Sequence, residues 1–145
     1  MARTNRSASS NDVIDEAVLT VDMPAHVSGP SGMNAIAHCV EALYAPDANP
    51  LSSLMAAEGI RTLAASLPVV VRSPAGLEAR STALLGAWLA GGALGATTMG
   101  LHHRLCHVLG GTFGLPHAET HSVILPHATA HNAPAATDAM TRAAR

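Results

Sequence analysis

Apolar residues recur at helical spacing through most of the chain, in segments separated by Pro and Gly. Ser31 is a favoured N-cap residue and predicts a helix over about residues 32–45. Asn49 and Pro50 are typical of the cap and first turn of a second helix, which we expect to run to about Ser66. The pattern therefore predicts a series of helices.

A third segment, residues 81–101, contains no charged residue. A run of about twenty uncharged residues also suits a membrane span. This run is rich in Gly and Ala and lies between Arg80 and Arg104, so we interpret it as a buried helix whose small residues permit close packing. The last residues, 133–145, predict a further amphipathic helix with Thr137 as its N-cap.

Composition also favours helices. The 145 residues include one Trp, one Tyr and one Phe, so a core must consist of Ala, Leu, Val and Met, which suit packed helices better than sheets. The formal net charge of −2 provides no basic surface for nucleic acid. Cys39 and Cys106 follow no secretory signal, which favours reduced, buried thiols over a disulfide. We expect an all-α, cytoplasmic protein that binds neither nucleic acid nor membrane.

The chain divides into three predicted parts. Residues 1–12 are polar and rich in Ser and Asn, which predicts a disordered leader. Residues 13–30 are expected to form an arm, and residues 31–145 form one helical domain, for which the length is sufficient. The final helix ends without a cap or a last apolar turn, so we expect this domain to be incomplete at its C-terminus.

Histidines are concentrated between residues 100 and 132, a stretch that holds seven of the nine. His103 and His107 are four apart and share a helix face, and a turn rich in Gly can fold His117 back toward them. Asn34 and His38 form a second pair at the same spacing. One oxygen donor and three imidazoles would suit a divalent transition metal. From the residues alone, a core histidine bonded to a carbonyl is the simpler interpretation of His38.

Three segments carry a family resemblance: SGMNAIAHCVEALYA, GLHHRLCHVLGG and LPHAETHSVILPH. Their order and spacing resemble the helical metal-binding domain of the iron-containing alcohol dehydrogenases, and most of all the maleylacetate reductase branch. The resemblance extends from about Val13 to the end of the chain. It implies a helical-bundle domain that lacks the N-terminal dinucleotide-binding α/β domain of that family.

The resemblance also implies roles for individual residues. His38, His103 and His117 match the metal-binding histidines of the family, and Asn34 stands where the wider family has an Asp ligand. A neutral amide should bind iron or zinc more weakly than a carboxylate does, so metal use is open. His107 matches a histidine that faces the nicotinamide and the substrate. His107 and His103 are therefore the expected catalytic groups, with His107 also contacting the cofactor.

The other polar groups near this site receive simpler predictions. His102 points about 100° away from His103 on the helix, where it would contact substrate or solvent. Structural or surface roles are expected for His121, His127 and His131. Arg104 is expected to be solvated, although a guanidinium there could attract a carboxylate substrate.

The implied reaction is the reduction of the carbon–carbon double bond of maleylacetate to 3-oxoadipate by NADH or NADPH, a step in the degradation of aromatic compounds. The partner would be a small dicarboxylate, and a homo-oligomer is left open. Two alternatives compete: a general iron-dependent or glycerol-type alcohol dehydrogenase, and a catalytically silent helical module that binds metal or associates with other chains. Because the chain has no phosphate-binding glycine segment of its own, we expect it to be inactive in isolation.

Overall fold

The computed structural model describes residues 16–145. The predicted leader and the first residues of the predicted arm, 13–15, lie outside the described residues. The elements are α2 (Ala25–Tyr44), α3 (Pro50–Arg72), α4 (Leu77–Ala96), α5 (Leu101–Phe113), α6 (His117–Asn132), the 3-10 helix η1 (Ala133–Ala135) and α7 (Thr137–Ala143). No strand occurs in the described part of the chain, and the predicted all-α class is confirmed.

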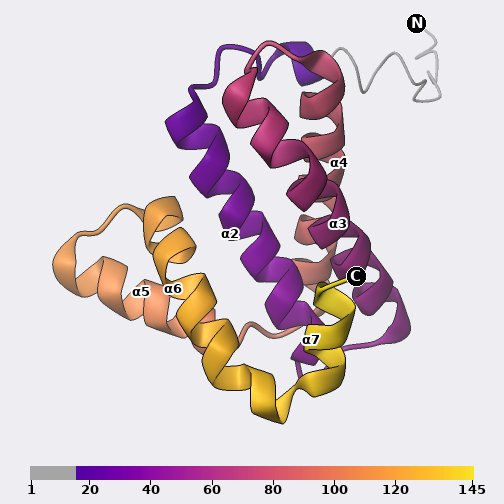
Figure 1. Ribbon diagram of the computed structural model, residues 1–145. Helices are drawn as coiled ribbons and strands as arrows, with labels where there is room; N and C mark the ends of the chain where they lie inside the picture. Colours follow the sequence, from indigo (N-terminus) through magenta and orange to yellow (C-terminus); the bar gives the residue numbers. More distant parts are fainter. Residues whose placement is uncertain (1–15) are drawn as a thin grey trace, which may run out of the picture.

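Helix α2 lies at the centre of the arrangement (Figure 1). It packs against α3 and α4 on one side and against α6 on the other, while α5 and α6 form an antiparallel pair. The short α7 packs against α2 and α3. Residues of α2 can therefore reach both the three-helix core and the α5–α6 pair.

The start of α2 differs from the prediction. The helix begins at Ala25, Ser31 lies inside it and does not cap it, and the predicted boundary between arm and domain at residue 30 falls within it. Packing explains the extension, because Ser28 and Gly32 are buried. A Cβ atom at position 32 would lie 2.3 Å from a methyl group of Leu67, so only glycine permits this approach of α2 to α3.

Helix α3 begins as predicted and ends later. The Asn49 side chain accepts hydrogen bonds from the backbone amides of Leu51 and Ser52, which confirms its capping role. The helix continues past Ser66 to Arg72 with Pro68 inside it. Proline removes one hydrogen bond within the helix, but the carbonyl that loses its partner belongs to an exposed residue, where water can replace the donor.

Helix α4 is a core helix on one face only. Ala90 and Ala93 are buried, whereas 70% of Trp88 is exposed. The uncharged run is not one helix, since α4 ends at Ala96 and α5 begins at Leu101 after a bend of 97°. By length and composition, α3 is the one described helix that could cross a membrane, and α4 with α5 would qualify only as a bent pair. We interpret α3 as a core helix, because α2 and α4 pack against it.

The core consists of small and aliphatic residues, as the composition requires. Its main cluster is Cys39, Ala42, Leu43, Ala56, Ala90, Ala93 and Ala139. Cys39 and Cys106 are both buried, as predicted, and they form no disulfide in the described part of the chain. Thr137, predicted as an N-cap, is instead the first residue of α7.

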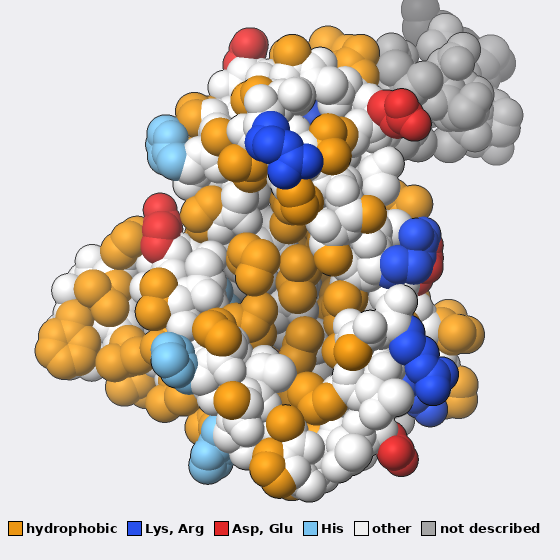
Figure 2. All heavy atoms as spheres, viewed as in Figure 1, with side chains coloured by type: hydrophobic (Ala, Val, Ile, Leu, Met, Phe, Trp, Pro, Cys, Tyr) orange, Lys and Arg blue, Asp and Glu red, His pale blue; other side chains and the backbone are white. Residues whose placement is uncertain are grey.

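Much apolar surface stays exposed. Figure 2 shows hydrophobic side chains gathered over the length of α2 and around the free end of the α5–α6 pair. At that end 64% of Val108 and 68% of Phe113 are exposed. Apolar surface that gathers in this way usually marks a contact surface.

Candidate active site

Six histidines from three helices form one cluster, which we call the imidazole cluster: His38 on α2, His102, His103 and His107 on α5, and His117 and His121 on α6. The rings of His38 and His103 stack with centroids 4.7 Å apart, and those of His117 and His121 are 4.3 Å apart. The rings of His103 and His121 are 4.8 Å apart, so these two pairs are in contact with each other. The structure therefore brings together the four histidines singled out in the sequence.

A tight connection between α5 and α6 produces this convergence. Gly114 ends α5 in the left-handed conformation, with φ of 64°, which a residue with a Cβ atom rarely adopts. Leu115 and Pro116 complete the connection, and His117 is the first residue of α6. The turn is shorter than predicted, because Gly110 and Gly111 belong to α5. The rings of His107 and His117 lie 6.0 Å apart across it.

Glu41 forms the floor of the cluster. Its carboxylate is 1% exposed and accepts a hydrogen bond of 2.6 Å from Nδ1 of His103. It also accepts from the backbone amides of Gly100 at 3.0 Å and His102 at 2.8 Å. Burial alone would raise the pKa of Glu41, but these hydrogen bonds outweigh it and lower the pKa to about 2. Glu41 is therefore an anion at neutral pH.

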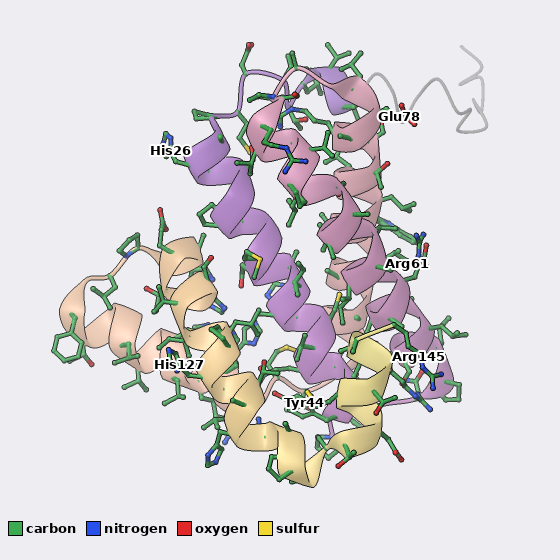
Figure 3. The ribbon with its side chains drawn as sticks, in the orientation of Figure 1. His26, Tyr44, Arg61, Glu78, His127 and Arg145 are labelled. Carbon is green, nitrogen blue, oxygen red and sulfur yellow. The ribbon has the colours of Figure 1, made fainter. Side chains whose placement is uncertain are left out.

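Tyr44 extends this contact toward α6. Its hydroxyl donates to Glu41 at 3.2 Å and accepts from the side-chain amide of Asn132 at 3.1 Å. Figure 3 shows Tyr44 at the end of α2, where α6 passes it. Burial raises the pKa of Tyr44 to about 12, so the hydroxyl keeps its proton.

His102 and His121 form a second buried unit. Neither side chain is exposed, and Nε2 of His102 lies 2.9 Å from Nδ1 of His121. Of the two alternatives predicted for His102, contact with solvent is wrong, because α6 covers the face of α5 that carries it; contact with substrate stays a prediction. His121 is buried at the centre of the cluster, whereas His127 and His131 are exposed (Figure 3 labels His127).

Burial keeps several of these rings neutral. Burial and the neighbouring histidines lower the pKa of His38 to about 4 and that of His121 to about 3. The pKa of His102 falls to about 4, first through burial and then through the charge of His103. Neutral imidazoles carry a free lone pair on one nitrogen, which is the form that binds metal or accepts a proton.

Three buried polar atoms around the cluster have no hydrogen-bond partner in the described part of the chain. They are Oδ1 of Asn34, Nε2 of His103 and Nε2 of His121. Two trios bring one ligand atom from each ring within 4.8 Å of one another: His102, His103 and His121, and His107, His117 and His121. Groups of imidazole nitrogens at these separations fit a divalent transition metal, but the predicted ligands Asn34 and His38 belong to neither trio.

The rim of the cluster is open. His107 and His117 are exposed, while Arg104 points to solvent as predicted. Small molecules can therefore reach the cluster from the side of His107 and His117.

A sequence search for metal ligands alone would miss Glu41 and His121. The signals for them are positional, since Glu41 follows Asn34 by two helical turns and His121 follows His117 by one.

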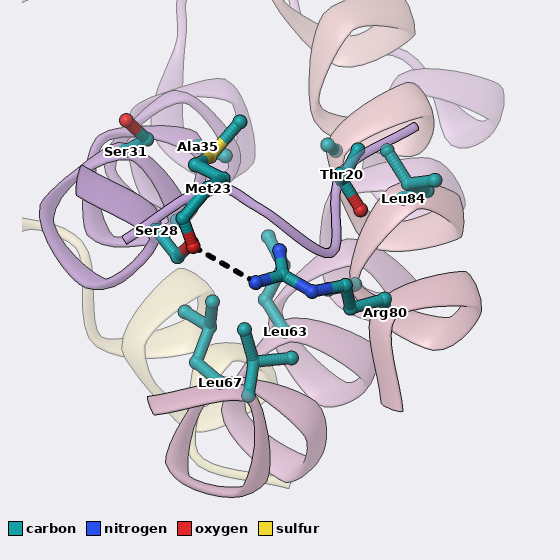
Figure 4. A pocket seen from close by; sticks show the side chains of 13 residues that line it. Thr20, Met23, Ser28, Ser31, Ala35, Leu63, Leu67, Arg80 and Leu84 are labelled. Carbon is teal, nitrogen blue, oxygen red and sulfur yellow. Dashed lines mark hydrogen bonds between the residues drawn. The ribbon is translucent and has the colours of Figure 1, made fainter. Parts of the chain in front are cut away.

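A separate cavity of about 160 Å³ lies between α2, α3 and α4. Its walls are largely apolar, and the buried guanidinium of Arg80 donates to the backbone carbonyl of Met23 at 2.9 Å (Figure 4). Arg80 also donates to the carbonyls of Val21 and Pro74, so it holds the segment before α2 against α4. The cavity contains none of the histidines and is distinct from the candidate active site.

This helical arrangement with its histidine site is matched by a known protein family. Residues 29–145 match the family described as Fe-containing alcohol dehydrogenase family, C-terminal. The chain belongs to the iron-containing alcohol dehydrogenase family, as the resemblance in its sequence implied.

Within the family, several maleylacetate reductases are similar to this chain, as is a putative alcohol dehydrogenase from Ralstonia eutropha JMP134, whose crystal structure matches with a TM-score of 0.86 and 60% identity over 87% of this chain and 36% of that one. The chain is 56% identical to the maleylacetate reductase of Sphingobium indicum over 133 residues. This match covers 92% of this chain and 38% of that relative. The crystal structure of maleylacetate reductase from Agrobacterium tumefaciens matches with a TM-score of 0.86 and 53% identity over 87% of this chain and 36% of that one. The corresponding enzyme from Rhizobium sp. strain MTP-10005 matches with a TM-score of 0.85 and 52% identity, covering 87% and 36% of the two chains. The chain thus spans a little over a third of the length of these relatives.

Proposed function

We propose that this chain is the helical part of a cytoplasmic maleylacetate reductase, which reduces the carbon–carbon double bond of maleylacetate to 3-oxoadipate. One observation carries the proposal: His38, His103, His107 and His117 converge in a chain that is 56% identical to a maleylacetate reductase. When bound, NADH or NADPH would supply the hydride, and a divalent metal would polarise the oxo oxygen as a Lewis acid.

The charges that arise in this reaction suit the groups on the chain. Hydride addition to the far carbon of the conjugated system moves an electron pair onto the oxo oxygen, and a proton then joins the carbon next to that carbonyl. His107 lies at the open rim, where it can donate a hydrogen bond to this oxygen and supply the proton. His103 lies deeper, and its Nε2 is buried without a hydrogen-bond partner in the described residues. A well-placed donor to such an oxyanion contributes about 3 kcal/mol to the barrier reduction.

A metal would be held by Asn34, His38, His103 and His117, the set that the family resemblance implies; the two trios in the structure contain His103 or His117, but neither Asn34 nor His38. All four are neutral ligands, so a divalent ion would bind less tightly than in a site with one carboxylate ligand. Without metal, the imidazole donors and the amide of Asn34 would have to stabilise the same negative charge. Metal use is therefore a property in which this chain should differ from family members that carry Asp at this position.

A chimera tests the proposal. Residues 29–145 would replace the matching part of the Sphingobium indicum enzyme, and the product would be assayed for NADH oxidation with maleylacetate and for NAD reduction with simple alcohols. We expect activity with maleylacetate, and His107→Gln should lower kcat by about a hundredfold. His127→Gln is the matched control, because His127 is exposed outside the cluster. A folded chimera that oxidises simple alcohols and leaves maleylacetate unchanged would favour the general alcohol dehydrogenase alternative.

A further inference from the structure

The one carboxylate that contacts the imidazole cluster in the described part of the chain is Glu41, and the reaction has no direct use for it. It is buried beneath His103 and belongs to α2, whereas all its hydrogen-bond donors except Tyr44 lie at residues 100–103. We propose that Glu41 is a positioning residue, which fixes the ring of His103 in one tautomer and fixes the start of α5. The role of His103 in the reaction rests on the proposed function, whereas the contacts between Glu41 and His103 do not.

The tautomer follows from the hydrogen bond. A carboxylate has only acceptor sites, so the atom 2.6 Å from Glu41, Nδ1 of His103, must carry the proton. Nε2 of His103 then presents a lone pair into the cluster, where it is buried and has no partner in the described residues. A histidine that ligates a metal or accepts a proton commonly depends on a carboxylate in this way.

The same carboxylate replaces the missing cap of α5. The N-cap position is Gly100, which has no side chain to accept the first free amides of the helix. Glu41 accepts from the amides of Gly100, His102 and His103 instead, at 3.0, 2.8 and 3.3 Å. A Cβ atom at position 100 would lie only 3.0 Å from Oε1 of Glu41, so glycine permits the close approach of this anion. The negative charge is also favourable at the positive end of the helix.

Both effects act on His103. The capping contacts hold the first turn of α5, and therefore the backbone of His103, against α2. The side-chain contact fixes which nitrogen of His103 is available. A purely structural role for Glu41 would require only the capping contacts, so the tautomer of His103 separates the two possibilities.

Long-range ¹H–¹⁵N correlation spectra of the ¹⁵N-histidine-labelled chain test this inference directly. They distinguish protonated from bare ring nitrogens, and His103→Gln identifies the signals of His103. The spectra would be recorded with a metal chelator and without substrate, at about pH 8, where a free histidine is neutral. We expect a single tautomer of His103 with the proton on Nδ1. A proton on Nε2 in the parent chain would overturn the proposal.

Glu41→Gln is the decisive variant. A glutamine can accept through its oxygen or donate through its NH₂ group, so we expect the single tautomer to be lost and a mixture to appear. Tyr44→Phe is the matched control, since it removes one donor to Glu41 and leaves the carboxylate in contact with His103. Hydrogen exchange of the His102 amide should become roughly tenfold faster in Glu41→Gln. An unchanged Nδ1 tautomer in a folded Glu41→Gln would refute the positioning role.

The measurement stays informative if Glu41→Gln does not fold. The spectrum of the parent chain then provides the test. A proton on Nδ1 of His103 that is donated to a carboxylate at 2.6 Å must give a resolved downfield resonance. Absence of that resonance would overturn the inference. A chimera that fails to reduce maleylacetate has no bearing on these spectra, so the two proposals can fail separately.

Discussion

Acidification should destabilise the folded chain through the buried pair His102 and His121. In the folded state burial, followed by the charges of neighbouring histidines, lowers the pKa of His102 to about 4 and that of His121 to about 3. Both side chains titrate near 6.5 when the chain is unfolded. As the pH falls below about 6.5, the unfolded chain binds protons that the folded chain excludes, so the free energy of unfolding decreases. The loss is complete once the pH passes below the folded-state pKa values.

The magnitude follows from these values. A pKa lowered from 6.5 to about 4 corresponds to about 3 kcal/mol for one isolated histidine. The two rings share a hydrogen bond and lie near a rim that is open to water, so their contributions are screened and do not add fully. We expect a combined loss of about 2–4 kcal/mol between neutral pH and about pH 4. Glu41 contributes outside this window, because its pKa falls from 4.5 to about 2 and its stabilising effect is lost only below about pH 4.5.

Urea unfolding followed by far-ultraviolet circular dichroism, in the presence of a chelator, measures this dependence. His121→Gln should reduce the dependence on pH by roughly a third, since His38, whose pKa is also lowered to about 4, and His102 still titrate. His127→Gln should leave it unchanged, because that side chain is exposed. A free energy of unfolding that stays constant from about pH 7 to about pH 4.5 would refute the burial argument.

Three further predictions concern the metal and the helices. Asn34→Asp should bind more iron or zinc than the parent chain when both are purified and analysed for metal, because the ligand set gains a charge; equal, stoichiometric metal in both would contradict this. Gly32→Ala should lower the free energy of unfolding by about 1–3 kcal/mol, since its Cβ atom would overlap Leu67, whereas Gly91→Ala, with nothing within 4 Å, should be neutral or stabilising in the same urea titration. Asn49→Ala should cost about 1 kcal/mol through loss of the cap of α3, and an unchanged unfolding midpoint would show that the cap is dispensable.

Features that depend on neighbouring residues could be predicted from the sequence. Asn49 followed by Pro50 gave the start of α3, because a cap and a first turn are local interactions. The spacing of His103 and His107 placed both on one face of α5 for the same reason, and their rings lie 6.2 Å apart. The low aromatic content correctly indicated helices packed through Ala and Leu.

Helix ends that depend on packing against residues distant in sequence could not be predicted. Ser31 has a strong capping preference, yet α2 starts at Ala25 because Ser28 and Gly32 are buried against other helices. Pro68 is a helix breaker by its own chemistry, yet α3 continues through it to Arg72. In both cases the energy of packing exceeds a local preference of about 1–3 kcal/mol.

The convergence of the predicted histidines could be anticipated from the sequence, whereas the role of the carboxylate beneath them could not. His38, His103 and His117 could be named because the motifs fix their spacing. Glu41 lies 59 residues from Gly100 in sequence, and no local pattern indicates that the end of α2 meets the start of α5. The burial of His102 could likewise not be predicted, because it depends on α6 covering that face.

Two contacts build the site, one between His107 and His117 and one between Glu41 and the start of α5. They differ in the sequence separation of their residues, and this difference sets the order in which they form. His107 and His117 approach each other through a link of only Gly114, Leu115 and Pro116, so closing this small loop requires little entropy. The link from Glu41 to α5 encloses α3 and α4, and it can form only after those helices have brought the ends of a long loop together. During folding the α5–α6 hairpin should therefore form early as an unattached unit, and the proton on His103 should acquire its fixed position last.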